Sequence, residues 1–156
     1  MKTQPIAALN IVAPAAKTIY PEPFAATVAG REKRKLGNHF GLKNFGVNLT
    51  RLAPGAASAL LHHHSKQDEF IYILDGAPTL VLGAETYVLK PGDCVGFPAA
   101  NGIAHQLTNR SEQDVLYIEV GDRTAGDEVE YPNDDLKATM GDDGAWRLTH
   151  KDGRPY

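Results

Sequence analysis

The segment GAASALLHHHSKQDEF (residues 55–70) places three consecutive histidines shortly before the carboxylate of Glu69. Alternate side chains of a β-strand share a face, so His62 and His64 point one way and His63 points the opposite way. A later strand-like stretch carries His105. Two imidazoles on one face, a carboxylate and a third imidazole from another strand can surround one divalent metal ion. This segment therefore predicts a metal site within a β-structure.

The sequence around this segment is a succession of short apolar or alternating runs, each ended by proline, glycine or aspartate. Runs of this length with such turn residues are typical of an antiparallel sandwich or barrel, and no helical period interrupts them. We expect strands at residues 47–52, 58–64, 69–74, 79–82, 85–89, 94–97, 105–108 and 114–120. This predicts an all-β fold whose barrel core spans residues 44–121.

The two flanks of the core differ from it in composition. Residues 1–43 are predicted to form an N-terminal arm rather than a signal peptide, because Pro5, Asn10 and Pro14 interrupt its first apolar run. The basic patch REKRK (residues 31–35) is interpreted as a solvated turn, with a phosphate-binding site as the alternative. Residues 122–156 are predicted to form a C-terminal extension, with strands at 129–131 and 146–150 and a short helix at 133–140.

Length and composition limit the classes of function. A chain of 156 residues fits one domain, residues 1–156. The net charge of −3, without a long basic or acidic run, gives no support for binding nucleic acid or a membrane surface, and no stretch is apolar enough for a membrane helix. Cys94 is the only cysteine, which excludes an intrachain disulfide and favours a cytoplasmic location. We expect Cys94 to be a small packed hydrophobe rather than a reactive thiol.

The run FIYIL (residues 70–74) is apolar on both faces. Ile71 and Ile73 share the parity of Glu69 and should face the barrel interior. Phe70, Tyr72 and Leu74 should then face outward and be covered, either by the N-terminal arm or by a second subunit. We predict a homodimer on this basis.

The spacing of the candidate ligands resembles that of a known family. The first motif reads G-x6-H-x-H-x4-E-x6-G from Gly55 to Gly76, and the second reads G-x5-P-x3-G-x2-H-x3-N from Gly92 to Asn109. Together they resemble the two motifs of the cupin superfamily. Relative to that family, one extra residue precedes His62, and the loop between Pro98 and Gly102 is longer.

The resemblance implies a double-stranded β-helix, the jelly-roll barrel of cupins, with one metal ion held inside it. Carried over by position, the ligands are His62, His64, Glu69 and His105. Glu69 is preferred to its neighbour Asp68 because it has the motif spacing and the inward parity. Three imidazoles and one carboxylate suit manganese, iron, zinc, nickel, cobalt or copper without distinguishing among them.

The remaining cavity residues are less well defined by the sequence. Tyr87, Tyr117 and Glu119 are candidates for a catalytic acid or base. Asn109 is interpreted as a turn former, and His39 and His150 as residues without a metal role. Three residues of the extension could close the mouth of the barrel, although core packing is the first interpretation for the tryptophan: Tyr131, Trp146 and Lys151.

The chain most resembles small single-domain bacterial cupins named as sugar-phosphate isomerases, in the stretches KPGDCVGFP (90–98), YIEVG (117–121) and WRLTHKDG (146–153). We therefore predict a metalloenzyme that isomerises a small polar hydroxy-carbonyl substrate. An iron-dependent dioxygenase is the second hypothesis. A small-molecule binding or sensing protein without turnover is the third, and it is disfavoured because the chain has no room for a fused DNA-binding or signalling domain.

Overall fold

The turn-punctuated runs of the sequence form β-strands. Within residues 4–13 and 18–156, which this computed structural model describes, there are twelve strands and three short helices. The helical elements are η1 (Ala8–Asn10), η2 (Phe24–Val28) and α1 (Leu36–Phe40). The strands are β1 (Arg31–Lys35), β2 (Phe45–Leu52), β3 (His63–His64), β4 (Glu69–Asp75), β5 (Thr79–Leu82), β6 (Glu85–Val88), β7 (Cys94–Phe97), β8 (His105–Thr108), β9 (Val115–Asp122), β10 (Glu128–Glu130), β11 (Lys137–Met140) and β12 (Trp146–Thr149).

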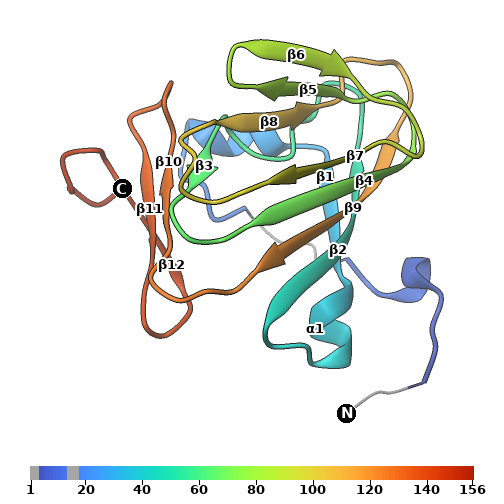
Figure 1. The fold of residues 1–156 in the computed structure, drawn as a ribbon, viewed down its shortest axis with the longest axis horizontal. Coiled ribbons are helices and arrows are strands. Elements are labelled where there is room, and N and C mark those ends of the chain that lie inside the picture. The colour runs from blue at the N-terminus through green and yellow to red at the C-terminus, as the bar shows by residue number, and fades with distance from the viewer. Residues whose placement is uncertain (1–3, 14–17) are drawn as a thin grey trace.

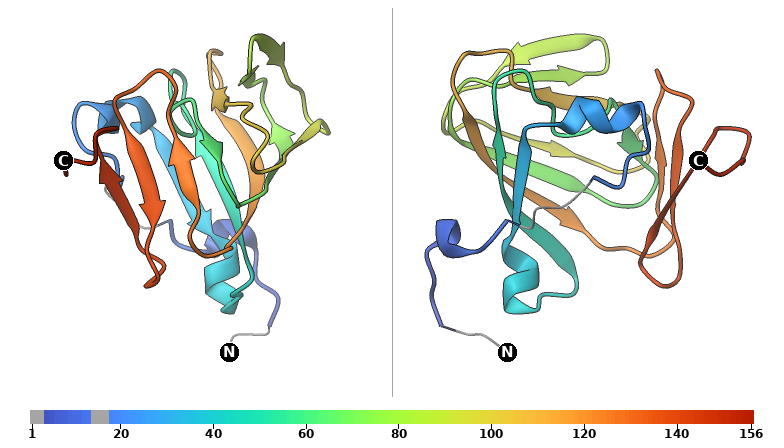
Figure 2. Two further views of the ribbon diagram at one scale, coloured as in Figure 1. Left: turned by 60° about the vertical axis from the view of Figure 1, so that its left-hand side comes forward. Right: turned by 180° about the vertical axis from the view of Figure 1, so that it is seen from behind.

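The strands form three antiparallel sheets (Figure 1). A five-stranded sheet has the order β1-β2-β9-β4-β7, a four-stranded sheet the order β12-β11-β10-β3, and a three-stranded sheet the order β6-β5-β8. An isolated bridge between His62 and His105 connects the second and third sheets beside β3 and β8. Figure 2 shows the sheets curving around a common interior, with α1 at one end. This architecture confirms the predicted all-β antiparallel barrel.

The core lies where the inner faces of the five-stranded and three-stranded sheets meet. Leu52, Ile73 and Val115 have no exposed surface, and they pack with Leu80 and Leu107 of the facing sheet. Buried residues are two apart along β4, at Ile71 and Ile73, and along β9, at Val115 and Tyr117, which is the alternation expected of a sheet with one buried face. Ile71 also lies in this core, which confirms the predicted inward parity of β4.

The opposite face of β4 is open. Phe70, Tyr72 and Leu74 are 39%, 41% and 42% exposed, so nothing in the described part of the chain buries them fully. Cys94 lies directly across from Tyr72 on β7 and is also exposed. The expectation that Cys94 is a packed hydrophobe was wrong, because its strand position places it on the outer face of the sheet.

The C-terminal extension forms the second apolar cluster of the fold. Val129 on β10 and Ala138 on β11 are paired residues, and both are buried against Leu60, Tyr131 and Leu136. The predicted helix at 133–140 was therefore wrong. Cross-strand burial of Ala138 between Val129 and Leu148 outweighs the helix propensity of that segment.

Two other segments differ from expectation. Residues 31–35 form strand β1, paired along its whole length with β2, and not a solvated turn. Only His63–His64 of the predicted strand at 58–64 is a strand, because the segment before it bends and returns to the sheet through the His62 bridge. The predicted glycine turn after β4 is present: Gly76 has a φ of 83°, and a Cβ atom there would lie 2.7 Å from the carbonyl oxygen of Asp114.

The N-terminal arm is described only in part. Residues 1–3 and 14–17, on which part of that prediction rests, lie outside the described residues. Ile11 of the arm is buried at 7% exposure. Among the described residues, no helix combines the length and the apolar character needed to cross a bilayer.

Candidate metal centre

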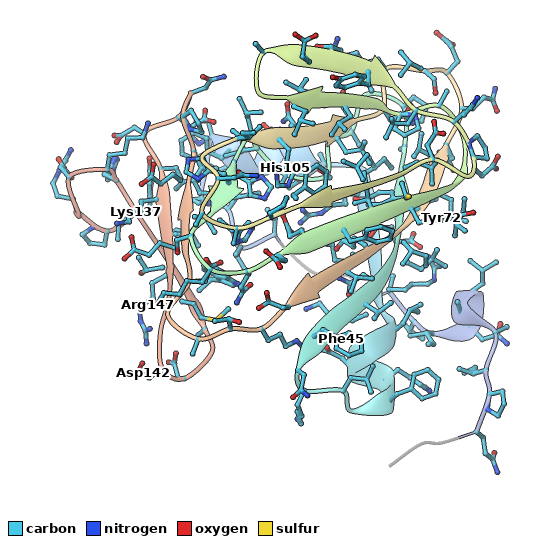
Figure 3. The ribbon with its side chains drawn as sticks, in the orientation of Figure 1. Phe45, Tyr72, His105, Lys137, Asp142 and Arg147 are labelled. Atoms are coloured by element: carbon cyan, nitrogen blue, oxygen red, sulfur yellow. The ribbon has the colours of Figure 1, made fainter. Side chains whose placement is uncertain are left out.

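Three imidazoles converge on one carboxylate oxygen inside the barrel. The Oε2 atom of Glu69 lies 3.0 Å from Nε2 of His105, 3.4 Å from Nε2 of His64 and 3.5 Å from Nε2 of His62. Glu69 begins β4, His105 begins β8, and the other two histidines lie at and just before β3. Figure 3 shows His105 in the region between β8 and β3. The four residues singled out by their spacing are thus brought together by three sheets.

In two of the histidines, the ring nitrogen that points away from Glu69 lies next to a hydrogen-bond acceptor. Nδ1 of His62 lies 2.8 Å from the carbonyl oxygen of Leu60, and Nδ1 of His64 lies 2.5 Å from Oδ2 of Asp127. A carbonyl oxygen can only accept, so Nδ1 of His62 carries the hydrogen and its Nε2 presents a lone pair to Glu69. Two acceptors that face one another repel unless a proton or a cation lies between them. The donor set therefore fits a cation.

His105 has a different environment. Its Nδ1 atom is buried and has no hydrogen-bond partner among the described residues, so no outer acceptor determines its tautomer. Its ring instead stacks on Phe97, with centroids 3.8 Å apart and planes inclined by 7°. The ring of Tyr131 also stacks on the ring of His62, with centroids 6.0 Å apart and planes inclined by 27°. The contact with Phe97 fixes the ring orientation of His105, which no hydrogen bond at Nδ1 does, and the contact with Tyr131 adds to the hydrogen bond that holds His62.

Burial and mutual contact set the charge states of the cluster. Burial opposes ionisation of Glu69, but the surrounding histidines outweigh that cost and hold the pKa of its carboxyl well below the usual range. Burial lowers the pKa of His105 in spite of its hydrogen bond with Glu69. An ionised carboxylate and a neutral imidazole are the states that metal coordination requires.

The neighbouring candidates in the sequence lie elsewhere. Oδ1 of Asp68 accepts a hydrogen bond from the backbone of Ala99 at 2.8 Å, which gives it a loop role. The side chain of His63 points away from the cluster, with Nε2 3.6 Å from a carboxylate oxygen of Glu130. Asn109 is buried and donates to the carbonyls of Leu52 and Gln113, as expected of a turn former.

A cavity of about 900 Å³ opens beside the cluster and contains a second polar group. Glu119 on β9 accepts hydrogen bonds from Nδ2 of Asn48 at 2.8 Å and from the hydroxyl of Tyr117 at 3.1 Å, and its Oε1 lies 2.5 Å from Nζ of Lys33. Burial, and next the charge of Glu119, raise the pKa of Tyr117 well above its usual value. Tyr117 therefore stays protonated at neutral pH and donates its hydrogen bond to Glu119.

The structure separates the other sequence candidates. Tyr87 is 47% exposed on β6 and does not line this cavity, so it is removed from the candidates for catalysis. Tyr131 and Trp146 line the cavity and also pack in the second apolar cluster. Lys151 does not line it; its Nζ donates to the carbonyl of Pro132.

Three residues of the site were not predicted from the sequence: Lys33, Asn48 and Asp127. Asp127 has no exposed surface and also accepts from the backbone of Lys66 at 2.8 Å and the hydroxyl of Ser65 at 3.1 Å. Its position in an acidic, loop-like tail gave no signal. The basic patch at 31–35 did contain Lys33, and strand parity would have placed its alternate side chains on one face once the strand was recognised.

Comparison with known proteins identifies the family. A family model described as a cupin domain matches residues 48–121. A crystal structure of a sugar phosphate isomerase from a cupin superfamily of Silicibacter pomeroyi is 39% identical, with a TM-score of 0.84 over 89% of this chain and 88% of that one. The chain belongs to the cupin superfamily.

Other cupin structures are more distant. A protein of Acidithiobacillus ferrooxidans, provisionally named as a sugar phosphate isomerase, is 31% identical, with a TM-score of 0.72 over 81% of this cupin and 80% of that chain. The polyketide cyclase RemF of Streptomyces resistomycificus is 19% identical, with a TM-score of 0.62 over 78% of this chain and 80% of its own, and it shares the fold alone. None of the curated proteins compared with this cupin matches it.

Proposed function

We propose that this cupin is a metal-dependent isomerase that interconverts the aldose and ketose forms of a small sugar phosphate. The observation that carries the proposal is the juxtaposition of two groups in one cavity: the cluster around Glu69 and the carboxylate of Glu119. The likeness to a sugar phosphate isomerase from Silicibacter pomeroyi supports the substrate class.

One divalent transition metal ion would be held by His62, His64, Glu69 and His105. Their converging nitrogens and oxygen, and the outer acceptors on two of the rings, support this assignment. When bound, such an ion supplies a Lewis acid for a carbonyl oxygen and the hydroxyl next to it.

Glu119 would move the proton. Isomerisation removes a proton from the carbon next to the carbonyl and returns one to the former carbonyl carbon, so one base that becomes an acid can serve both steps. Gly121 on β9 is paired with Glu69 on β4. Glu119 is the next residue of β9 on the same face as Gly121, about 7 Å away along the strand. Tyr117 is excluded as the base because its raised pKa keeps it protonated.

Lys33 and Asn48 would keep Glu119 in place. Lys33 lies on the edge strand β1, where it is paired with Thr50 of β2. Its Nζ reaches Glu119 from the side of β9 that faces away from β4. Asn48 is paired directly with Glu119. The carboxylate is thus oriented by a cation and an amide.

The test is turnover of aldose and ketose phosphates in deuterated water by protein reconstituted with each divalent metal. Interconversion with solvent deuterium appearing at carbon, and without oxygen uptake, is the expected result. Oxygen consumption dependent on iron would instead identify a dioxygenase. Saturable binding without turnover of any substrate would identify a binding protein.

A further inference from the structure

We infer that the phosphate group of the substrate binds at a cationic patch, defined as Lys35, Lys43 and Arg123, across the cavity from the metal cluster. The inference rests on the proposed function for its sugar component, while the anion site itself is argued from geometry alone. All three side chains line the same cavity as Glu69 and Glu119.

Strand register places the patch and the cluster at the two ends of one row. Glu69 on β4 pairs with Gly121 on β9, and Gly121 pairs with Gly46 on β2. Directly paired residues in antiparallel strands share a face, so this row faces the cavity. Two strand spacings separate Glu69 from Gly46, about 10 Å.

The two glycines leave this row without side chains. A Cβ atom on Gly121 would lie 3.8 Å from Cγ of Glu69, and one on Gly46 would lie 3.7 Å from Nη2 of Arg123. The two glycines therefore place no side chain of their own between the carboxylate and the guanidinium. A short polar ligand can lie along this row with one end at Glu69 and the other at Arg123.

Arg123 is positioned to bind an anion. Its Nη1 donates to the carbonyl of Leu42 at 2.8 Å, and its Nη2 donates to Oδ1 of Asn38. These acceptors orient the guanidinium without neutralising it, because neither is charged. A guanidinium has five N–H donors, so three remain for a ligand, in the geometry that suits phosphate.

No carboxylate of the described residues forms an ion pair with the patch. Within residues 4–13 and 18–156, Lys35 and Lys43 have no ion-pair or hydrogen-bond partner for their side chains. Three of the carboxylates that line the cavity have basic partners: Glu69 the histidines, Glu119 Lys33, and Asp143 Arg147. Asp122 keeps its charge, but its oxygens accept from the backbone N–H groups of Asp68 and Thr124 and not from the patch. Three cations without acidic partners match a phosphate dianion better than a single carboxylate.

The ligand would then have a defined direction. The carbonyl end would lie at the histidine cluster, the reacting carbons near Glu119, and the phosphate beside the guanidinium of Arg123. The basic segment at 31–35 thus contributes Lys35 to anion binding and Lys33 to the orientation of Glu119, which explains why alternate residues of β1 carry positive charge on the inner face.

The experiment is calorimetric titration of the full chain with inorganic phosphate, both loaded with metal and after chelation, so that binding to the metal ion is separated from binding to the patch. We expect Arg123→Ala and Lys35→Ala each to weaken phosphate binding about 10-fold in both states, the loss of one charge-assisted contact. Arg110→Ala is the control, because it removes the same charge from an exposed side chain that does not line the cavity. Lys35→Ala breaks no bond within the described chain, so its effect does not depend on how Arg123→Ala folds.

A second arm compares a hexose 6-phosphate with the same unphosphorylated hexose. Tighter binding of the phosphate ester, lost in Arg123→Ala with metal content unchanged, is the expected result. Equal phosphate affinity in wild type, Arg123→Ala and Lys35→Ala would overturn the inference. Phosphate binding at the patch without isomerisation would support the anion site and reject the isomerase. Turnover of unphosphorylated sugars that Arg123→Ala does not affect would reject the anion site and support the isomerase.

Discussion

Nδ1 of His64 lies 2.5 Å from Oδ2 of Asp127, a carboxylate with no exposed surface that is 63 residues away in the chain. Asp127 is one residue before β10, which pairs with β3 and so brings the two together. The carboxylate directs Nε2 of His64 toward Glu69. The C-terminal extension thus orients one side of the candidate metal centre.

We expect Asp127→Asn to weaken metal binding by about 10- to 100-fold, because an amide can present its N–H to His64 and reverse the tautomer. Competition with a chelator measures the affinity. Ser65→Ala is the control, since it removes another bond to Asp127 but leaves His64 untouched. Equal affinity in Asp127→Asn and wild type would show that Asp127 has only a structural role.

The three adjacent histidines allow a sharp test of the ligand set. His64→Ala and His105→Ala should remove most of the metal, because a three-ligand remnant binds much less tightly. His63→Ala should leave metal content nearly unchanged, since its ring faces Glu130 on the opposite side. Elemental analysis of untagged protein measures this, and comparable metal loss in all three variants would reject the ligand assignment.

Glu119→Gln should reduce isomerase turnover by about 100-fold or more while metal content stays at the wild-type level, because the amide has nearly the shape of the carboxylate but cannot accept the proton. Tyr87→Phe should leave turnover unchanged, since Tyr87 lies outside the cavity. Turnover is followed by deuterium incorporation from solvent. If Glu119→Gln retained full activity, another group would have to be the base.

The outer face of β4 predicts self-association. We expect a homodimer that buries Phe70, Tyr72 and Leu74, because three large apolar side chains in a row are otherwise left in contact with water. Tyr72→Glu should give a monomer by light scattering at micromolar concentration. Cys94 lies beside Tyr72, so its thiol should react more slowly in the wild type than in Tyr72→Glu. A wild-type monomer would contradict the prediction.

The barrel was predictable because its signals are local. Turn residues end each run, and alternation along 69–74 assigns Ile71 and Ile73 to the core and Phe70 and Tyr72 to the outer face, as observed. The errors came where local preference competed with distant pairing. The local sequence of 133–140 favours a helix, but Ala138 is buried in a strand that pairs with β12. Cys94 was predicted to be a core residue, but its pairing with Tyr72 places it on the outer face.

The sequence by itself determined most strands of the barrel core and the parity of His62, His64 and Glu69, because these depend on neighbours a few residues away, but it missed the strands β1 and β11. The two motif spacings added His105 to the ligand set. Tertiary structure alone decided what surrounds those side chains. Asp127 reaches His64, Lys33 reaches Glu119, and Arg123 lies over Gly46 through pairings between distant strands. Such contacts depend on register and on the path of the chain between the strands, which no local pattern encodes.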